Sequence, residues 1–209
     1  MNFIELAAAR HSVRKYEPGL TIDDAELQQL FDTVILSPSS YNVQHWQFVV
    51  VRDQARKTEL SGLSFGQPQV ADAAAVVLVC GRLDAFEDAP RIYADVDPEM
   101  REKSVGRILG AYTGAPALQR EEAIRSGSLA AMSLMYAAKA LGWDSGPMIG
   151  FEADKVSAFL NLDARTIPVM MIVVGKALNG EQPARAYRRP VAEVVKLETL
   201  DGASLGAGA

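Results

Sequence analysis

The sequence predicts a mixed α/β layer arrangement around one sheet, and two observations lead to this fold class. Three apolar runs rich in β-branched residues, 47–52, 75–80 and 167–175, are typical of strands. Helical patterns lie before, between and after these runs. Because no linker or internal repeat divides the 209 residues, we expect a single domain, 1–209, with 200–209 as a disordered tail.

Two helices are expected before the first strand. Residues 2–10 predict a short helix with Phe3, Leu6 and Ala7 on one face. A second helix is expected to begin with Thr21 as its N-cap, because the acidic residues that follow suit the positive end of a helix. Its apolar residues continue at helical spacing to residue 35, and Pro38 favours its end.

The remaining elements follow from hydrophobic pattern. The runs 75–80 and 167–175 are continuously apolar, as expected for strands that are covered on both faces. A less pronounced run, 191–197, predicts a C-terminal strand, and 152–160 predicts a short amphipathic helix. The strongest helix is 121–141, whose small residues would permit close approach of another helix: Gly127, Ser128, Ala130 and Ala131.

Gly106, Gly110 and Gly114 recur at every fourth residue and would share one face of a helix. Each glycine costs about 1 kcal/mol relative to alanine in a helix. Close packing on that face is one explanation, and a frayed or broken helix is the other. The spacing is not a dinucleotide-binding fingerprint, because no strand leads directly into it.

Composition excludes several functions. The chain has 21 Lys and Arg against 26 Asp and Glu, a net charge of −5, which argues against a nucleic-acid-binding or polybasic membrane-surface protein. No apolar run reaches the ~18 residues of a membrane span, and the start does not resemble a signal peptide, so a cytoplasmic location is expected. With one Cys and two His, no metal site is expected, and redox chemistry would need a bound cofactor.

Two polar segments in the first quarter of the chain are candidates for chemistry. Residues 10–15 place two arginines and a serine within five residues, which suits a phosphate; a solvated basic loop is the alternative. Residues 37–46 carry Asn and Gln amides that suit the edge of a heteroaromatic ring. The alternative for this segment is a capping and turn segment. That alternative accounts well for the residue types at 37–40 and poorly for those at 42–46.

Two further segments lie in the second half. Residues 144–151 contain Gly and Pro on an unusual backbone path and would offer backbone N–H groups; a plain helix-to-helix turn is the alternative. Residues 185–190 form a second cationic cluster that would bind an anion, or else a charged surface loop.

Together the four segments resemble the FMN-dependent nitroreductase family over nearly the whole chain. In family order they are Arg10-x-Ser12-x-Arg14, Pro38-Ser39-Ser40-x-Asn42-x-Gln44-x-Trp46, Pro147-x-x-Gly150-Phe151 and Arg188-x-Pro190. Gln44-His45 and Gly66-Gln67 make the chain most similar to a bacterial branch of NAD(P)H nitroreductases associated with quinone and hydroquinone stress. The resemblance implies an α+β, three-layer fold: a central, mostly antiparallel mixed sheet flanked by helices, with a C-terminal strand extending onto the partner subunit.

The resemblance also implies a homodimer with FMN at its interface and a role for each matching residue. Phosphate would be held by Arg10, Ser12 and Arg188, with Arg189 or Arg185 as the alternative ligand, and His11 would contact FMN through its backbone. The partner subunit would supply Ser39, Ser40 and Asn42, with Gln44 beside them. The ring edge or ribityl chain would meet Gln67 and Gln69, and the loop over the flavin face would be Pro147, Met148, Ile149 and Gly150.

Two of these positions are the expected catalytic residues. Arg14 would lie beside the pyrimidine end of the ring, where a cation stabilises the charge that reduction adds. At Ile149, where the best-known branch has an acid, the backbone N–H that faces flavin N5 is retained. His45 replaces a proline of many members; it would donate a proton to substrate or pack beside Trp46. Cys80, in a buried strand, is expected to be inert packing.

The implied function is an enzyme that oxidises NAD(P)H and reduces quinones, nitroaromatic compounds or both by ping-pong hydride transfer through flavin N5. Its acceptor would be a small aromatic molecule. The alternatives are an FMN store or sensor without turnover, and a family member that destroys flavin or removes halogen from its substrate. Such members carry an extra lid segment, for which 85–118 is the candidate.

Overall fold

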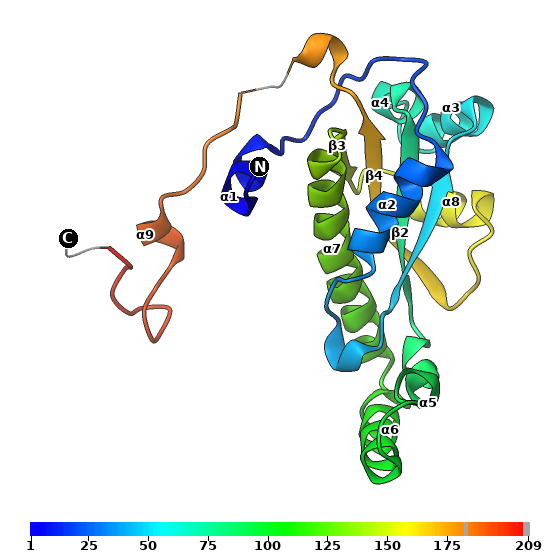
Figure 1. Ribbon diagram of the computed structural model, residues 1–209, viewed down its shortest axis with the longest axis vertical. Coiled ribbons are helices and arrows are strands. Elements are labelled where there is room, and N and C mark those ends of the chain that lie inside the picture. The colour runs from blue at the N-terminus through cyan, green and yellow to red at the C-terminus, as the bar shows by residue number, and fades with distance from the viewer. Residues whose placement is uncertain (182–183, 207–209) are drawn as a thin grey trace.

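The computed structural model describes residues 1–181 and 184–206, and a four-stranded sheet forms its centre (Figure 1). The strands are β1 (Trp46–Val51), β2 (Ala75–Arg82), β3 (Asp144–Met148) and β4 (Thr166–Gly175). Their order across the sheet is β1-β2-β4-β3, and every neighbouring pair is antiparallel. The three runs predicted as strands are therefore confirmed.

Helices cover both faces of the sheet. One face packs against α2 (Asp24–Val34) and the long α7 (Pro116–Ala140). The other face packs against three short helices: α3 (Gln54–Gly62), α4 (Pro68–Asp72) and α8 (Ala153–Phe159). This is the α+β, three-layer fold that the sequence resemblance implies.

The two faces of β2 explain its continuous apolar run. Val77 and Val79 face the α2 and α7 layer, whereas Val76, Leu78 and Cys80 face the three short helices. Burial raises the pKa of the Cys80 thiol to about 12, so the thiol stays protonated.

The small residues of α7 serve a different neighbour from the one expected. A Cβ on Gly127 would lie 3.0 Å from the Val169 side chain of β4, so the glycine lets the helix approach the sheet, not another helix. Ala130 and Ala131 are fully buried against the same face. Their small side chains set the spacing between helix and sheet.

Three local predictions are corrected by the structure. The N-cap of α2 is Asp23, not Thr21: its carboxylate accepts from the Glu26 N–H at 2.8 Å, and Glu26 returns the bond. Residues 144–148 form strand β3 at the sheet edge instead of a loop. The predicted strand 191–197 contains a short helix, α9 (Val191–Val194), because this segment lies on an arm away from the sheet.

Residues 85–118 project beyond one end of the sheet (Figure 1). They contain η2 (Ala85–Asp88), α5 (Ala89–Ile92) and α6 (Pro98–Tyr112), and they have a small apolar cluster of their own. Gly106 and Gly110 lie inside α6 with open space where a Cβ would stand, and Gly114 follows the helix at φ +72°. The expectation of a broken helix is correct at Gly114, which lies between the end of α6 and the start of α7. Close packing is not found at Gly106 and Gly110, because no described residue packs on them.

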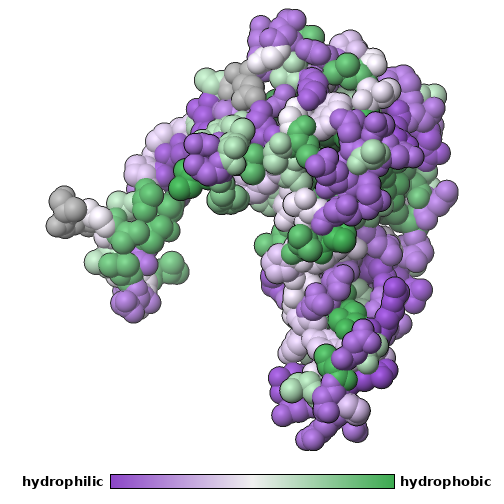
Figure 2. All heavy atoms as spheres, in the orientation of Figure 1, coloured by the Kyte–Doolittle hydropathy of each residue, from purple (hydrophilic) through white to green (hydrophobic). Residues whose placement is uncertain are grey.

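The two ends of the chain lie outside the sandwich. Helix α1 (Phe3–Ala9) contacts α7 through Phe3 and Tyr136, and η3 (Leu178–Gly180) precedes the C-terminal arm, which is 184–206. Figure 2 shows hydrophobic side chains gathered on this arm. Residues 196–205 fold back on themselves through a Lys196–Ser204 bridge, and 207–209 of the expected tail lie outside the described residues. Within the described chain, no helix is long and apolar enough to cross a bilayer.

The N-terminal segment joins the sheet at its edge. The Val13 N–H donates to the Ser145 carbonyl at 3.0 Å, and Ser12 and Ser145 form a parallel bridge. A Cβ on Gly146 would lie 2.5 Å from the Val13 carbonyl oxygen. Only glycine allows the segment to lie this close to β3.

We predict opposite effects for two glycine substitutions. Gly146→Ala should lower the free energy of unfolding by about 1–3 kcal/mol, the usual cost of overpacking. Gly106→Ala, on the open face of α6, should raise it by about 0.5–1 kcal/mol through helix propensity. Urea unfolding of both variants measures the difference, and equal effects would contradict the close approach at Gly146.

Candidate functional site

A cavity of about 110 Å³ opens where the N-terminal segment meets β3. Four parts of the chain that are distant in sequence line it: Ser12, Val13, Arg14, Gln67, Gln69, Gly146, Pro147, Met148 and Val173. Two of the four sequence motifs and both predicted glutamines therefore meet at one place. The sheet edge supplies the floor, and the pairing of Val13 with Ser145 fixes the basic segment above it.

Gln67 holds the loop that follows β3. Its amide nitrogen donates to the carbonyls of Ser64 at 3.0 Å and Gly150 at 2.8 Å, and its oxygen accepts from Gln69 at 2.8 Å. All three polar groups of this amide bond to protein, so Gln67 is a positioning residue. Gln69 lines the cavity wall, and its amide nitrogen is the group that donates to Gln67.

The cavity carries positive charge without a neutralising carboxylate. In the described part of the chain, neither Arg10 nor Arg14 forms an ion pair, and Arg10 reaches only the Ser12 hydroxyl at 3.5 Å. The buried Ser145 hydroxyl also lacks a hydrogen-bond partner among these residues. His11 stands beside them, with Nδ1 3.0 Å from the Ala9 carbonyl. Two guanidinium groups and the Ser12 hydroxyl are donors suited to an anionic ligand.

The C-terminal arm brings a third arginine to this segment. Arg185 donates to the carbonyls of Ala8 at 2.8 Å and Arg10 at 3.0 Å. Arg188 instead bonds to the carbonyls of Ala186 and Tyr187 on its own arm, and Arg189 is exposed. Within one chain the structure thus brings Arg185, not Arg188 or Arg189, against the Arg10 segment.

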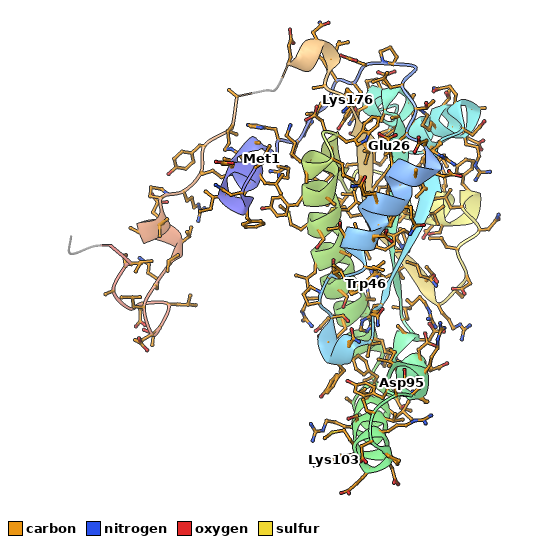
Figure 3. The ribbon with its side chains drawn as sticks, in the orientation of Figure 1. Met1, Glu26, Trp46, Asp95, Lys103 and Lys176 are labelled. Carbon is orange, nitrogen blue, oxygen red and sulfur yellow. The ribbon has the colours of Figure 1, made fainter. Side chains whose placement is uncertain are left out.

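The remaining motif lies at the other end of the sheet. Segment 39–44 leads into β1, whose first residue, Trp46, pairs with Gly81, whereas the cavity residues Gly146 and Val173 lie beside Val76. Gly81 and Val76 are five residues apart on β2, which is roughly 16 Å of strand. In Figure 3, Trp46 and Lys176 mark these two ends. Ser39, Ser40, Asn42 and Gln44 therefore do not reach the cavity of their own chain.

Segment 39–44 has an unusual backbone. Tyr41, Asn42 and Gln44 have φ values of 51°, 55° and 56°, in the left-handed region that such residues seldom adopt. The Ser39 hydroxyl accepts from the Gln44 N–H at 2.9 Å, and the Gln44 amide donates to the Asn42 carbonyl at 3.2 Å. Strain of this kind is typical of functional segments.

His45 lies beneath this segment and is fully buried. Its Nδ1 is 3.1 Å from the Ser126 hydroxyl, and its Nε2 lacks a partner among the described residues. Burial, and secondarily the charge of Arg82, lowers the pKa of His45 to about 4, so the ring is neutral at pH 7. An enclosed neutral ring supports the packing role for His45, not the proton donor.

Comparison with known proteins identifies the fold family. The sequence profile described as "Nitroreductase family" matches residues 7–176, which is most of the chain. The chain belongs to the nitroreductase family. Family membership confirms the oxidoreductase class that the sequence implies, and, because the family depends on FMN, it also confirms the cofactor.

Relatives and solved structures agree with this assignment. Bacillus subtilis MhqN, named as an NAD(P)H nitroreductase, is 36% identical over 93% of this chain and 98% of its own. The conjugated-linoleic-acid (CLA) biosynthesis enone reductase of Lactiplantibacillus plantarum is 33% identical over 86% of both chains. A nitroreductase-like protein of Exiguobacterium sibiricum, solved in complex with FMN, has a TM-score of 0.85 at 28% identity and covers 94% of this chain and 97% of its own.

The residues of the cavity fit an FMN molecule. Ser12 and Arg14 in the cavity, with Arg10 beside Ser12, supply donors for a phosphate and for an electron-rich ring edge, and Gln69 supplies an amide. Pro147 and Met148 offer apolar surface for a ring face. Sequence motifs alone did not show the bond from Gln67 to Gly150 or the contact of Arg185 with Arg10. Both join residues more than 80 positions apart, and no local pattern marks them.

We predict that His45 makes the fold sensitive to acid. Its folded pKa of about 4 lies below the 6.5 of an unperturbed histidine, so the unfolded chain binds the proton more tightly between these values. The stability contributed by His45 is thus complete above pH 6.5 and is lost as the pH falls toward 4. His45→Asn should reduce the difference in unfolding free energy between pH 6.5 and 4.5.

Urea unfolding at the two pH values measures this effect, with His11→Asn as the control because His11 lies only partly buried at the surface. An equal pH dependence in both variants would show that His45 does not couple folding to protonation.

Proposed function

We propose that the protein is a cytoplasmic homodimeric flavoenzyme that oxidises NAD(P)H and reduces quinones, nitroaromatic compounds or both. One observation carries the proposal: the two halves of the FMN site implied by the sequence lie at opposite ends of the sheet in one chain. Two copies packed in opposite directions would place segment 39–44 of each beside the cavity of the other. The site is incomplete in a single chain.

The exposed surface of α7 supports an interface between two copies. A groove of about 700 Å³ runs along this helix, lined mostly by apolar atoms of Ile124, Leu129 and Met132. Ile124 and Leu129 are 39% and 46% exposed, which is unusual for large apolar side chains at the centre of a long helix. Covering this face with a second α7 would bury it.

The C-terminal arm supports the same arrangement. It leaves the sandwich, and six of its large apolar side chains are at least 43% exposed: Tyr187, Val191, Val194, Leu197, Leu200 and Leu205. A second copy would cover these side chains. The arm, without a strand of its own chain to pair with, would then extend onto the partner as the resemblance implies.

In this site the protein binds and orients FMN and the substrates. FMN, when bound, supplies hydride transfer through its N5 atom. Arg10 and Ser12 would hold the phosphate, and the partner's segment 39–44 would close the ring from the other side. Arg14, unpaired at the cavity wall, would stabilise the negative charge that reduction places on the ring and so raise its reduction potential. The backbone N–H of Ile149, on the loop held by Gln67, would face N5.

The substrate class rests on the relatives. MhqN and YodC of Bacillus subtilis are named as NAD(P)H nitroreductases, and the Lactiplantibacillus relative is named as an enone reductase. A quinone contains the same conjugated carbonyl group as an enone, and both accept a hydride. A single cavity that serves donor and acceptor in turn predicts ping-pong kinetics.

We predict different effects for two arginines of the arm. Arg188→Ala should weaken FMN binding by about 1.5–3 kcal/mol, the value of a charged hydrogen bond, with little change in the melting temperature of the apoprotein. Arg185→Ala should lower both FMN affinity and apoprotein stability, because Arg185 holds the backbone of Arg10. FMN titration and thermal unfolding measure the two quantities. Unchanged affinity in Arg188→Ala would assign the phosphate to Arg185 or Arg189.

The proposed function predicts a yellow dimer with one FMN per chain that loses its flavin absorbance when NADH or NADPH is added without oxygen. Initial rates with a quinone and with a nitroaromatic acceptor should give parallel double-reciprocal lines. Bound FMN that NAD(P)H does not reduce would favour a storage or sensor protein. Loss of the flavin itself, or release of halide from a halogenated phenol, would instead favour the flavin-destroying or dehalogenating alternatives.

A further inference from the structure

A second polar cavity, of about 290 Å³, lies between segment 39–44 and helix α5. Five residues line it: Val43, Gln44, Asp88, Arg91 and Ile92. The first two belong to the segment that we place at the partner's flavin. The other three belong to the projecting excursion 85–118, which the sequence suggests as a candidate lid segment.

The excursion is attached firmly to segment 39–44. The Tyr93 hydroxyl donates to the Tyr41 carbonyl at 3.0 Å, and the rings of Phe86 and Tyr112 stack with centroids 5.5 Å apart. Tyr112 also meets the Tyr41 ring edge-on at 6.5 Å. The excursion that carries Arg91 is therefore held against the segment that carries Gln44.

The charged residues of this wall pair with one another, except for Arg91. Asp88 is paired with Arg82, which also bonds to Asp84 at 3.1 Å, and Asp84 pairs with Arg165 at 2.8 Å. These two arginines and two aspartates neutralise one another. Arg91 forms no ion pair in the described part of the chain, not even with Glu87, one helical turn earlier.

Gln44 adds a neutral donor to this cation. Its amide nitrogen uses one hydrogen on the Asn42 carbonyl, and the amide has a second. A guanidinium and an amide on facing walls match a carboxylate or phosphate.

We propose that this cavity is a subsite for an anionic group of a substrate, a carboxylate or phosphate bound by Arg91 and Gln44. The inference rests on the proposed function, since only in the dimer does segment 39–44 lie beside a flavin. The group comes from one of two sources, the 2′-phosphate of NADPH or a carboxylate on the aromatic acceptor. In either case the subsite selects anionic over neutral substrates of the same shape.

The test uses the FMN-loaded protein and two variants, Arg91→Ala and Arg91→Gln; the second keeps a polar side chain in case the first disturbs α5. Arg101→Ala is the matched control, because Arg101 is an exposed arginine of the same excursion outside the cavity. FMN content and far-ultraviolet circular dichroism verify that each variant is folded and loaded.

Two pairs of probes separate the sources. Rates of anaerobic flavin bleaching give dissociation constants for NADPH and NADH, and steady-state rates give KM for 4-nitrobenzoate and 4-nitrobenzamide. Removing Arg91 should weaken the anionic member of one pair by about tenfold or more, as expected for a charge-assisted hydrogen bond, and leave its partner unchanged. Weaker binding of NADPH alone identifies the 2′-phosphate as the bound group. A higher KM for 4-nitrobenzoate alone identifies the carboxylate of the acceptor.

Suppose that the wild-type protein binds FMN and is bleached by NAD(P)H. If the Arg91 variants then change the constants of anionic and neutral probes equally, or change none of them, the subsite is overturned and the proposed function stays intact. A wild-type protein that does not bind FMN or is not bleached would overturn the proposed function, and the subsite with it.

Discussion

The site depends on one backbone contact, the addition of residues 12–13 to strand β3. The Val13 N–H donates to the Ser145 carbonyl, and Gly146 leaves room for the Val13 carbonyl where any side chain would collide. β3 is an edge strand, so it has unpaired backbone groups for such a neighbour. The contact places Arg14 at the sheet edge, and the bond from Gln67 to Gly150 then fixes the loop on the opposite side. The segment that carries Arg14 and the loop that follows β3 are thus positioned by these hydrogen bonds.

The second constraint is the length of the sheet. Because β2 separates segment 39–44 from the cavity by roughly 16 Å of strand, bending a loop cannot join the two halves within one chain. The exposed face of α7 and the apolar arm are consistent with the same solution, a second copy packed in the opposite direction. In the proposed dimer, the interface that completes the cofactor site would also cover this apolar surface.

Much of the fold could be predicted from sequence, and the failures have physical causes. β2 and β4 were predictable because their apolar runs are continuous and rich in β-branched residues, as in strands covered on both faces, and α7 because its long apolar run faces a core. β3, with sequence Asp-Ser-Gly-Pro-Met, has almost no intrinsic strand preference; it pairs because it lies at an edge, where Pro147 is tolerated. Residues 191–197 have the opposite property: they include β-branched side chains, but no strand among the described residues lies beside them. The four site segments were recognisable as motifs, but their division between two ends of the sheet is a tertiary property that no local pattern carries.

Three arginines line the cavities described above, and their partners distinguish their roles. Arg125, in the groove on α7, is paired with both Glu121 and Glu122, so its charge is neutralised locally and suits a protein interface. Arg14 and Arg91 form no ion pair in the described part of the chain, although the protein as a whole is acidic. Leaving a cation unpaired in a chain with surplus carboxylates gives up favourable Coulomb energy unless a ligand supplies the missing anion. In the proposed sites Arg14 would meet the negative charge of a reduced flavin and Arg91 an anionic group of the substrate, although the net charge of the chain is −5.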